Sequence, residues 1–360
     1  MILLAALTLA LTGCVLPTQA VDLEGQLWEQ MGTSALEDAA EGTFSVKEGT
    51  NLQKGLGVLA SQASEQVDAV LHSAFRSAGF MLLVVLFCGV GSTLFQSGQS
   101  AMTRTADLIG VTVITLVAVS DTASMLGLGR EAIDQIDAFS KVLIPTMATA
   151  TAACGSVTGA VVRQAATLLF SDLLITLINR VLIPLVYLYI AVTAATAALG
   201  SKGIAAIAGF MKKGVKGVMT AILLVFTGYL TLSGAAAGAA DATALKATRM
   251  AISSMVPVVG GILSDATETV LTGASAIRSG IGIFGTLVIL GFCVVPFLYL
   301  GVQYLVYKLV AILASVLYQG TISDLIDQIG AAFGLVLGML GSCALLVLLS
   351  LIGTISVAMT

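Results

Sequence analysis

Long apolar runs without charged residues alternate with short polar stretches along most of this chain of 360 residues. A helix needs about 20 mainly apolar residues to cross a bilayer, so runs of this length predict an all-α polytopic membrane protein. About six transmembrane helices are expected, at residues 77–97, 105–129, 168–200, 217–240, 281–307 and 333–358. A seven-helix alternative splits residues 164–200 at Arg180 and lets residues 142–162 cross as well.

The segment before the first span has the pattern of an exported N-terminus. Residues 1–20 form an apolar run that ends in small residues, which predicts a signal sequence cleaved near Ala20. The stretch that ends at Cys14 resembles a lipoprotein box, so lipidation of Cys14 stays open, as does an uncleaved anchor. Every alternative exports residues 21–76, an acidic segment whose apolar residues recur at helical spacing.

The chain contains an internal duplication at an offset of 112 residues, which relates residues 105–200 to residues 217–312. At this offset Pro145 aligns with Pro257 and Pro184 with Pro296, so four of the five prolines pair. The residues around Pro184 and Pro296 also match in character. We therefore expect two parallel copies of one membrane unit.

The duplication predicts that Pro145 and Pro257 each begin a re-entrant or surface segment. The stretch after Pro257 includes Gly260, Gly261, Asp265 and Glu268, and it is too polar for an ordinary span. Its apolar residues are too many for a free loop, so it is expected to contact protein or line a cavity. We interpret it as a contact or gate surface, although the two carboxylates could instead bind a cation or relay protons.

The placement of basic residues predicts the orientation and the division of the chain. Four lysines between residues 200 and 217 form a basic cluster beside spans, which favours the cytoplasmic side. The expected parts are a signal peptide (1–20), an acidic extracytoplasmic helical segment (21–76), a first transmembrane helix (77–104), repeat 1 (105–200), a basic cytoplasmic loop (201–216), repeat 2 (217–312) and an amphipathic helix followed by a C-terminal transmembrane helix (313–360).

Composition and charge exclude several classes of function. The chain is 58% hydrophobic and only 10% charged. Soluble domains have about 25% charged residues, so this composition excludes a water-soluble globule of this size. Its net charge of −4 argues against nucleic-acid binding, and a single histidine argues against a zinc site or a histidine-based triad. A nucleotide-binding P-loop is absent from the sequence. We expect no catalytic, cofactor or metal residues.

Asp121 and Arg180 are the two candidate intramembrane charges. An ionisable residue within a span marks a functional site by default, because an unpaired charge is costly there. Each residue could instead lie at a helix end and reach the membrane interface.

From Arg249 onward the sequence resembles the stage III sporulation protein AE family of endospore-forming bacteria. The resemblance is carried by the stretch MVPVVGGILSDA at residues 255–266, by Gly280-Ile281-Gly282 and by Val295-Pro296. The lysine-rich segment, the 217–240 span and the exported N-terminal segment extend the likeness to about residues 50–360.

The resemblance implies a membrane subunit, either pore or assembly base, of the channel that joins mother cell and forespore and supports late forespore gene expression. The membrane implied is the mother-cell (outer forespore) membrane. The implied partners are the other stage III sporulation A-operon proteins, including the AA ATPase and the ring-forming AG and AH proteins, and stage II sporulation protein Q. A homo- or hetero-oligomer is expected. The alternative is a self-sufficient secondary transporter with a site at the repeat interface.

Overall fold

The structure, a computed structural model, describes residues 39–40, 52–94, 100–153, 157–255, 260–317 and 321–356. Within these ranges it contains helices and turns and no strand, which confirms the all-α prediction. The elements are α5 (Leu52–Leu94), α6 (Ser100–Ala153), α7 (Val157–Leu177), the π-helical turn η1 (Ile178–Leu182), α8 (Ile183–Leu199), α9 (Lys202–Met255), α10 (Gly260–Leu317) and α11 (Thr321–Ser356). The predicted signal sequence lies outside the described residues.

Among the described residues, six helical stretches are long and apolar enough to cross a membrane. They are Gln53–Gly91, Leu108–Ala152, Gln164–Leu199, Lys202–Leu232, Arg278–Leu317 and Thr321–Ile352. The prediction of six spans is confirmed. The seven-span alternative is not supported, because α7, η1 and α8 follow one another without a break and form a single stretch through Arg180.

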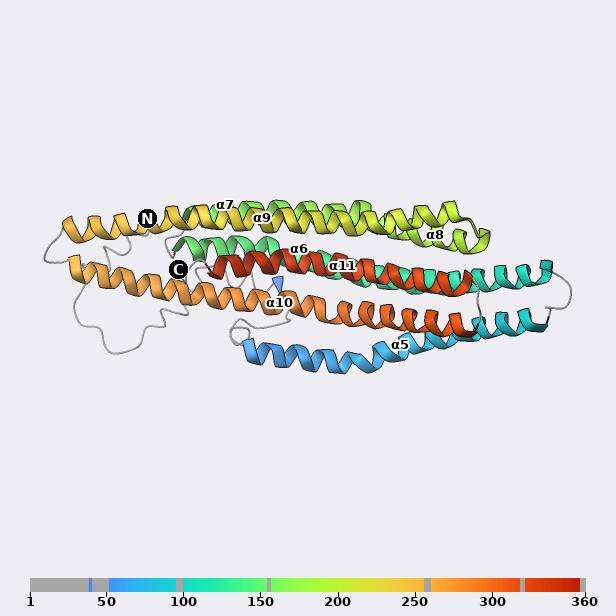
Figure 1. Cartoon of the computed structure of the whole chain (residues 1–360). Helices are drawn as coiled ribbons and strands as arrows, with labels where there is room; N and C mark the ends of the chain where they lie inside the picture. The colour runs from blue at the N-terminus through green and yellow to red at the C-terminus, as the bar shows by residue number, and fades with distance from the viewer. Residues whose placement is uncertain are drawn as a thin grey trace.

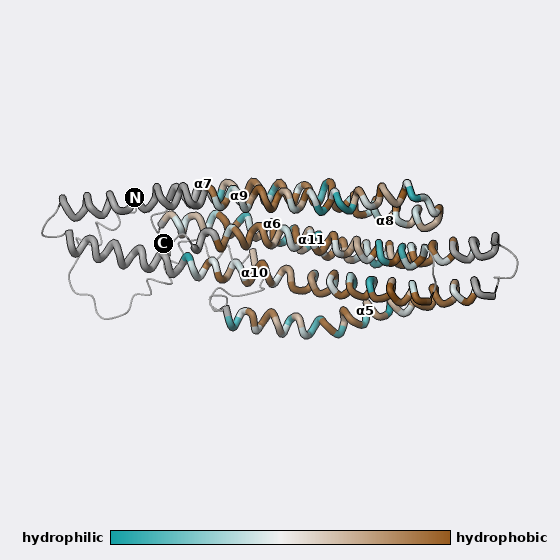
Figure 2. The backbone as a smooth tube through the Cα atoms, in the orientation of Figure 1, coloured by the Kyte–Doolittle hydropathy of each residue, from teal (hydrophilic) through white to brown (hydrophobic). Residues whose placement is uncertain are grey.

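The helices form an elongated bundle, with α10 and α11 in contact with most of the others (Figure 1). More than half of the most apolar part of each of these two helices is buried, whereas the outer helices bury a third of theirs or less. Helix α9 contacts α7, α8, α10 and α11, while α5 contacts α10 and α6 on the other side. Hydrophobic residues are prominent in the coloured parts of α10 and α11 (Figure 2).

Aromatic and small residues make the close contacts between helices. Phe139 of α6 lies against Phe284 and Phe292 of α10, with ring centroids 6.3 and 5.9 Å apart. Thr167 of α7 and Ser350 of α11 share a buried hydrogen bond of 2.6 Å. Close packing and interhelical hydrogen bonds of this kind drive helix association in membranes, where lipid offers no hydrophobic force between helices.

The longest helices are much longer than a bilayer is thick. Helices α6 and α9 have 54 residues each and α10 has 58. A rise of about 1.5 Å per residue makes them roughly 80–87 Å long, against about 30 Å for the hydrocarbon core. Each of these helices therefore continues well outside the membrane.

The prediction of separate Pro-started segments is corrected by the structure. Pro145 lies inside α6, which continues to Ala153, and the residues from Gly260 onward are the first turns of α10. Proline lacks the N–H that an α-helix uses, but long transmembrane helices tolerate it when neighbouring helices support the backbone. These stretches are therefore ends of long helices rather than re-entrant elements.

The expected basic loop at residues 201–216 is part of a helix. Only Gly200 and Ser201 separate α8 from α9, and the lysines lie on α9. Gly200 ends α8 with φ +66°, a left-handed conformation that glycine adopts without strain.

The duplication stays a prediction. Pro296 lies within α10 and Pro184 near the start of α8, but Pro257 lies outside the described residues.

Candidate functional site

Asp121 accepts two hydrogen bonds from α10, within a stretch of α6 that can cross a membrane. Its Oδ2 receives the Tyr307 hydroxyl at 2.9 Å and the Gln303 amide at 3.2 Å. Tyr307 is fully buried and Gln303 nearly so, while Asp121 is partly exposed. The carboxylate thus has fixed donors on one side and an open side, which suits either a structural bridge or a site for a proton or cation.

The other face of the same part of α10 carries an ion pair with α11. The Lys308 ammonium contacts the Asp327 carboxylate and also donates to the Asp327 carbonyl oxygen at 3.3 Å. The Tyr189 hydroxyl of α8 donates to the Gln328 carbonyl oxygen at 3.0 Å. Ion pairing of this kind satisfies charges within a largely apolar bundle.

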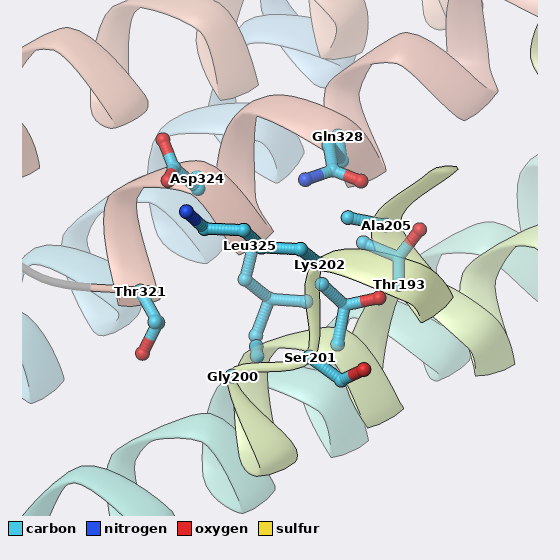
Figure 3. Close-up of a pocket in the computed structure, with 11 residues that line it drawn as sticks. Thr193, Gly200, Ser201, Lys202, Ala205, Thr321, Asp324, Leu325 and Gln328 are labelled. Atoms are coloured by element: carbon cyan, nitrogen blue, oxygen red, sulfur yellow. The ribbon is translucent and has the colours of Figure 1, made fainter. Parts of the chain in front are cut away.

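A cavity of about 200 Å³ lies at the turn between α8 and α9, against the first turns of α11 (Figure 3). In Figure 3 the Lys202 side chain extends toward Asp324 of α11. The remaining polar side chains of the lining are Thr193, Thr196, Ser201, Thr321 and Gln328. The cavity therefore presents one cationic group, one anionic group and several hydroxyls to a small polar ligand or to water.

Arg180 lies in the π-helical turn that precedes Pro184. The Ile183 N–H bonds to the Ile178 carbonyl oxygen, five residues back, because Pro184 cannot supply the next donor of a regular α-helix. The Arg180 side chain is exposed, while its neighbour Asn179 donates to Asp134 of α6 at 3.0 Å. Arg180 therefore does not join the Asp121 cluster.

The residues predicted for a gate surface are not brought together by described contacts. Gly260 and Gly261 begin α10, and Asp265 and Glu268 follow on its first turns, but their side chains lie outside the described part. Pro257 itself lies outside the described residues. The gate interpretation stays a prediction.

No group of three or more histidine, cysteine, aspartate or glutamate side chains is arranged to hold a metal ion within the described residues. Asp121 accepts from a tyrosine hydroxyl and an amide, and Lys308 is paired with a carboxylate. The chemistry that these side chains offer is the binding of a proton or a cation at Asp121 and ion pairing at Lys308 and Asp327.

Sequence reasoning identified Asp121 but missed its partners. Gln303, Tyr307 and Lys308 are spaced so that they lie on two faces of one helix, yet their partners are 19 to 186 residues away. One available signal was that Gln303 and Lys308 are polar residues in an otherwise apolar run, which indicates a buried partner.

A cysteine at Ser201 tests the predicted orientation. Because basic residues near the end of a span favour the cytoplasm, the turn between α8 and α9, which Lys202 follows, is expected there. Ser201→Cys should therefore stay unlabelled by an impermeant thiol reagent in intact cells, while Lys47→Cys should be labelled. Native Cys88, Cys293 and Cys343 are buried, and the unmodified protein sets the background. Labelling of Ser201→Cys from outside would reverse the orientation.

Comparisons with known proteins identify relatives by sequence. The model of the family described as Stage III sporulation protein AE matches residues 49–359. A protein of Bacillus subtilis (strain 168), described as Stage III sporulation protein AE, is 23% identical over 276 residues, which cover 76% of this chain and 69% of that protein. No solved structure matches the chain.

Proposed function

The chain belongs to the Stage III sporulation protein AE family, whose model spans residues 49–359, and we propose from this premise that it is an integral membrane subunit of the channel complex between mother cell and forespore. In this role it serves as the pore or as the base on which the complex assembles. Its place is the mother-cell (outer forespore) membrane. The family match is the observation that carries the proposal.

The architecture supports a scaffold or conduit rather than an enzyme. The described part contains six helices able to cross a membrane, and the longest extend well beyond a bilayer. Helices that project from the membrane offer surfaces on which soluble rings can assemble. Neither family description names a reaction.

The proposed partners come from the resemblance to the family, and one of them also fits a feature of the sequence. Its sequence has no nucleotide-binding loop, so a channel that uses nucleotide energy requires a separate subunit, for which we propose the AA ATPase of the same operon. The ring-forming AG and AH proteins and stage II sporulation protein Q complete the proposed assembly.

A secondary transporter is the second candidate, and one observation favours it. Asp121 belongs to predicted repeat 1, whereas Gln303 and Tyr307 belong to predicted repeat 2, so polar groups meet where the repeats meet. Transporters built from repeats place their sites at such an interface. The cluster of Asp121, Gln303 and Tyr307 contains a single carboxylate, which is a small number of charged groups for a site that couples transport to an ion.

Deleting the gene in its sporulating host tests the proposal. A late forespore-specific reporter should fall to background after engulfment, and the tagged full-length protein should restore it and copurify with A-operon proteins. A matched control is a deletion strain complemented with the empty vector. Normal reporter activity in the deletion strain, or a restored strain whose tagged protein recovers none of the proposed partners, would contradict the channel role.

A further inference from the structure

The axial register of the helices follows from their contacts. Gly129 of α6 packs against Val336 of α11 and, less closely, Leu300 of α10, while Gly338 of α11 packs against Met219 of α9. These contacts show that Gly129, Leu300, Val336 and Met219 lie at about the same height along the bundle axis, near the middle of the described bundle. We call this height the central level. Gly55 of α5 packs against Leu287 of α10.

Exposed charges occupy the central level on α5 and α9, on opposite sides of the bundle, and also on α6, where Arg130 and Glu131 follow Gly129. Helices α5 and α10 run in the same direction (Figure 1), so Asp68 of α5, 13 residues after Gly55, lies at the level of Leu300. Lys216 of α9 lies within one helical turn of Met219 and therefore at the same level. Glu65 and Asp68 form an acidic pair on α5, and Lys213 and Lys216 a basic pair on α9, with all four side chains exposed.

These four charges lack ion-pair partners among the residues that the structure describes. The nearby Lys212 is half-buried, and its charged neighbours are Lys308, Lys216 and Asp327. Arg76 lies two turns beyond Asp68, at the margin of the acidic pair. Exposed charges at the middle of an apolar bundle are costly in lipid unless protein or water covers them.

Large apolar side chains flank the charges in the same order on both helices. Above and below the basic pair, α9 exposes Ile207 and Phe210 on one side and Val218, Leu224, Val225 and Leu232 on the other. Around the acidic pair, α5 exposes Phe75 and Phe80 on the side that corresponds to Phe210, and Leu56 and Val58 on the other side. Along the bundle axis, each surface therefore has a charged pair with apolar residues on either side of it. The charged pairs of the two surfaces have opposite signs.

We propose that a second copy of this chain covers each surface, with α9 of one copy packed against α5 of the next. Parallel copies place Lys213 and Lys216 beside the neighbour's Glu65 and Asp68, and their flanking apolar residues against each other. Helices α5 and α9 lie on opposite sides of the bundle (Figure 1), so the contact is head-to-tail. Such contacts repeat from copy to copy and form a ring when the rotation closes.

Charge reversal in the purified full-length protein tests this interface, independently of sporulation and of the proposed function. In lipid nanodiscs or mild detergent, native mass measurement should find an oligomer for the wild type. Lys213→Glu with Lys216→Glu should reduce the oligomer at least about tenfold, because like charges then face each other. Glu65→Lys with Asp68→Lys should do the same, and combining all four changes should restore it.

The matched control is Lys141→Glu, the same charge reversal at an exposed lysine of α6, outside both surfaces, where it breaks only a local pair with Asp137 and should leave the oligomer intact. A second measurement uses separate chains carrying Asp68→Cys and Lys216→Cys, which should form a disulfide-linked pair only when coexpressed. A monomeric wild type, failure of the fourfold variant to reassemble, or no cross-link between coexpressed chains would overturn the proposal. An oligomer that resists both reversals would assign these surfaces to another partner.

Discussion

Replacing Gly330 with valine should remove most of the folded protein from the membrane. A Cβ at Gly330 would lie 3.0 Å from the Tyr307 Cβ and close to the backbone of α10 at Tyr307 and Lys308. None of these atoms is the end of a flexible side chain, so α10 and α11 must separate to make room. Overpacking costs about 1–3 kcal/mol, and here it also displaces the central helix pair and the Asp121 contact.

Gly301→Val on α10 is the matched control, because a Cβ there meets nothing within 4 Å. Both substitutions carry the same change in helix propensity, so their difference isolates the packing at Gly330. The measurement is the membrane-integrated amount of each variant and its thermal unfolding in detergent. Equal stability of the two variants would show that α10 and α11 do not approach as closely as the structure indicates.

The existence of the spans was predictable from sequence because an uncharged run of about 20 residues has few alternatives to crossing a bilayer. The lengths of the helices were not predictable in the same way. The charged stretch from Arg130 to Lys141 follows the expected 105–129 span, yet it continues the same helix as part of α6. Local pairs join Arg130 to Asp134 and Asp137 to Lys141. Pairs four residues apart support a helix just where hydropathy suggests a break.

Prolines were over-interpreted for a related physical reason. Pro145 and Pro296 each remove one backbone hydrogen bond, which a long helix supported by neighbours tolerates. Among the three prolines that the structure describes, Pro184 shows the clearest local effect, because the helix shifts to a π turn around Arg180 just before it. A proline therefore predicts a local defect in a membrane helix. Where the helix ends depends on its contacts with other helices.

The candidate site was predictable only in part. Asp121 is recognisable as an isolated acid in an apolar run, but its contact with Tyr307 depends on how α6 packs on α10, 186 residues later. The pairing of Lys308 with Asp327 likewise depends on the turn between α10 and α11. Sequence spacing gives the face of one helix and says nothing of which helix lies opposite.

The effect of removing the Asp121 carboxylate should depend on the shape of what replaces it. Asp121→Leu leaves the buried Tyr307 hydroxyl and the Gln303 amide without their acceptor, and an unsatisfied buried polar group costs about 1–3 kcal/mol. We therefore expect a severe loss of membrane-integrated protein and of forespore reporter activity. Asp121→Asn keeps an acceptor oxygen at the same place, so near-normal protein levels are expected.

The reporter activity of Asp121→Asn decides between the two candidate functions. A channel subunit uses Asp121 as a hydrogen-bonding bridge between α6 and α10, so the amide should support at least about half of wild-type reporter activity, since a neutral acceptor makes a weaker bond than a carboxylate. A transporter that protonates this carboxylate or binds a cation at it loses its function with the charge, while the protein still folds. Asp172→Leu is the control for an exposed aspartate on α7 and should be mild. Normal amounts of Asp121→Asn protein without reporter activity would favour the transporter over the channel subunit, because the amide keeps the shape and one acceptor oxygen but loses the negative charge.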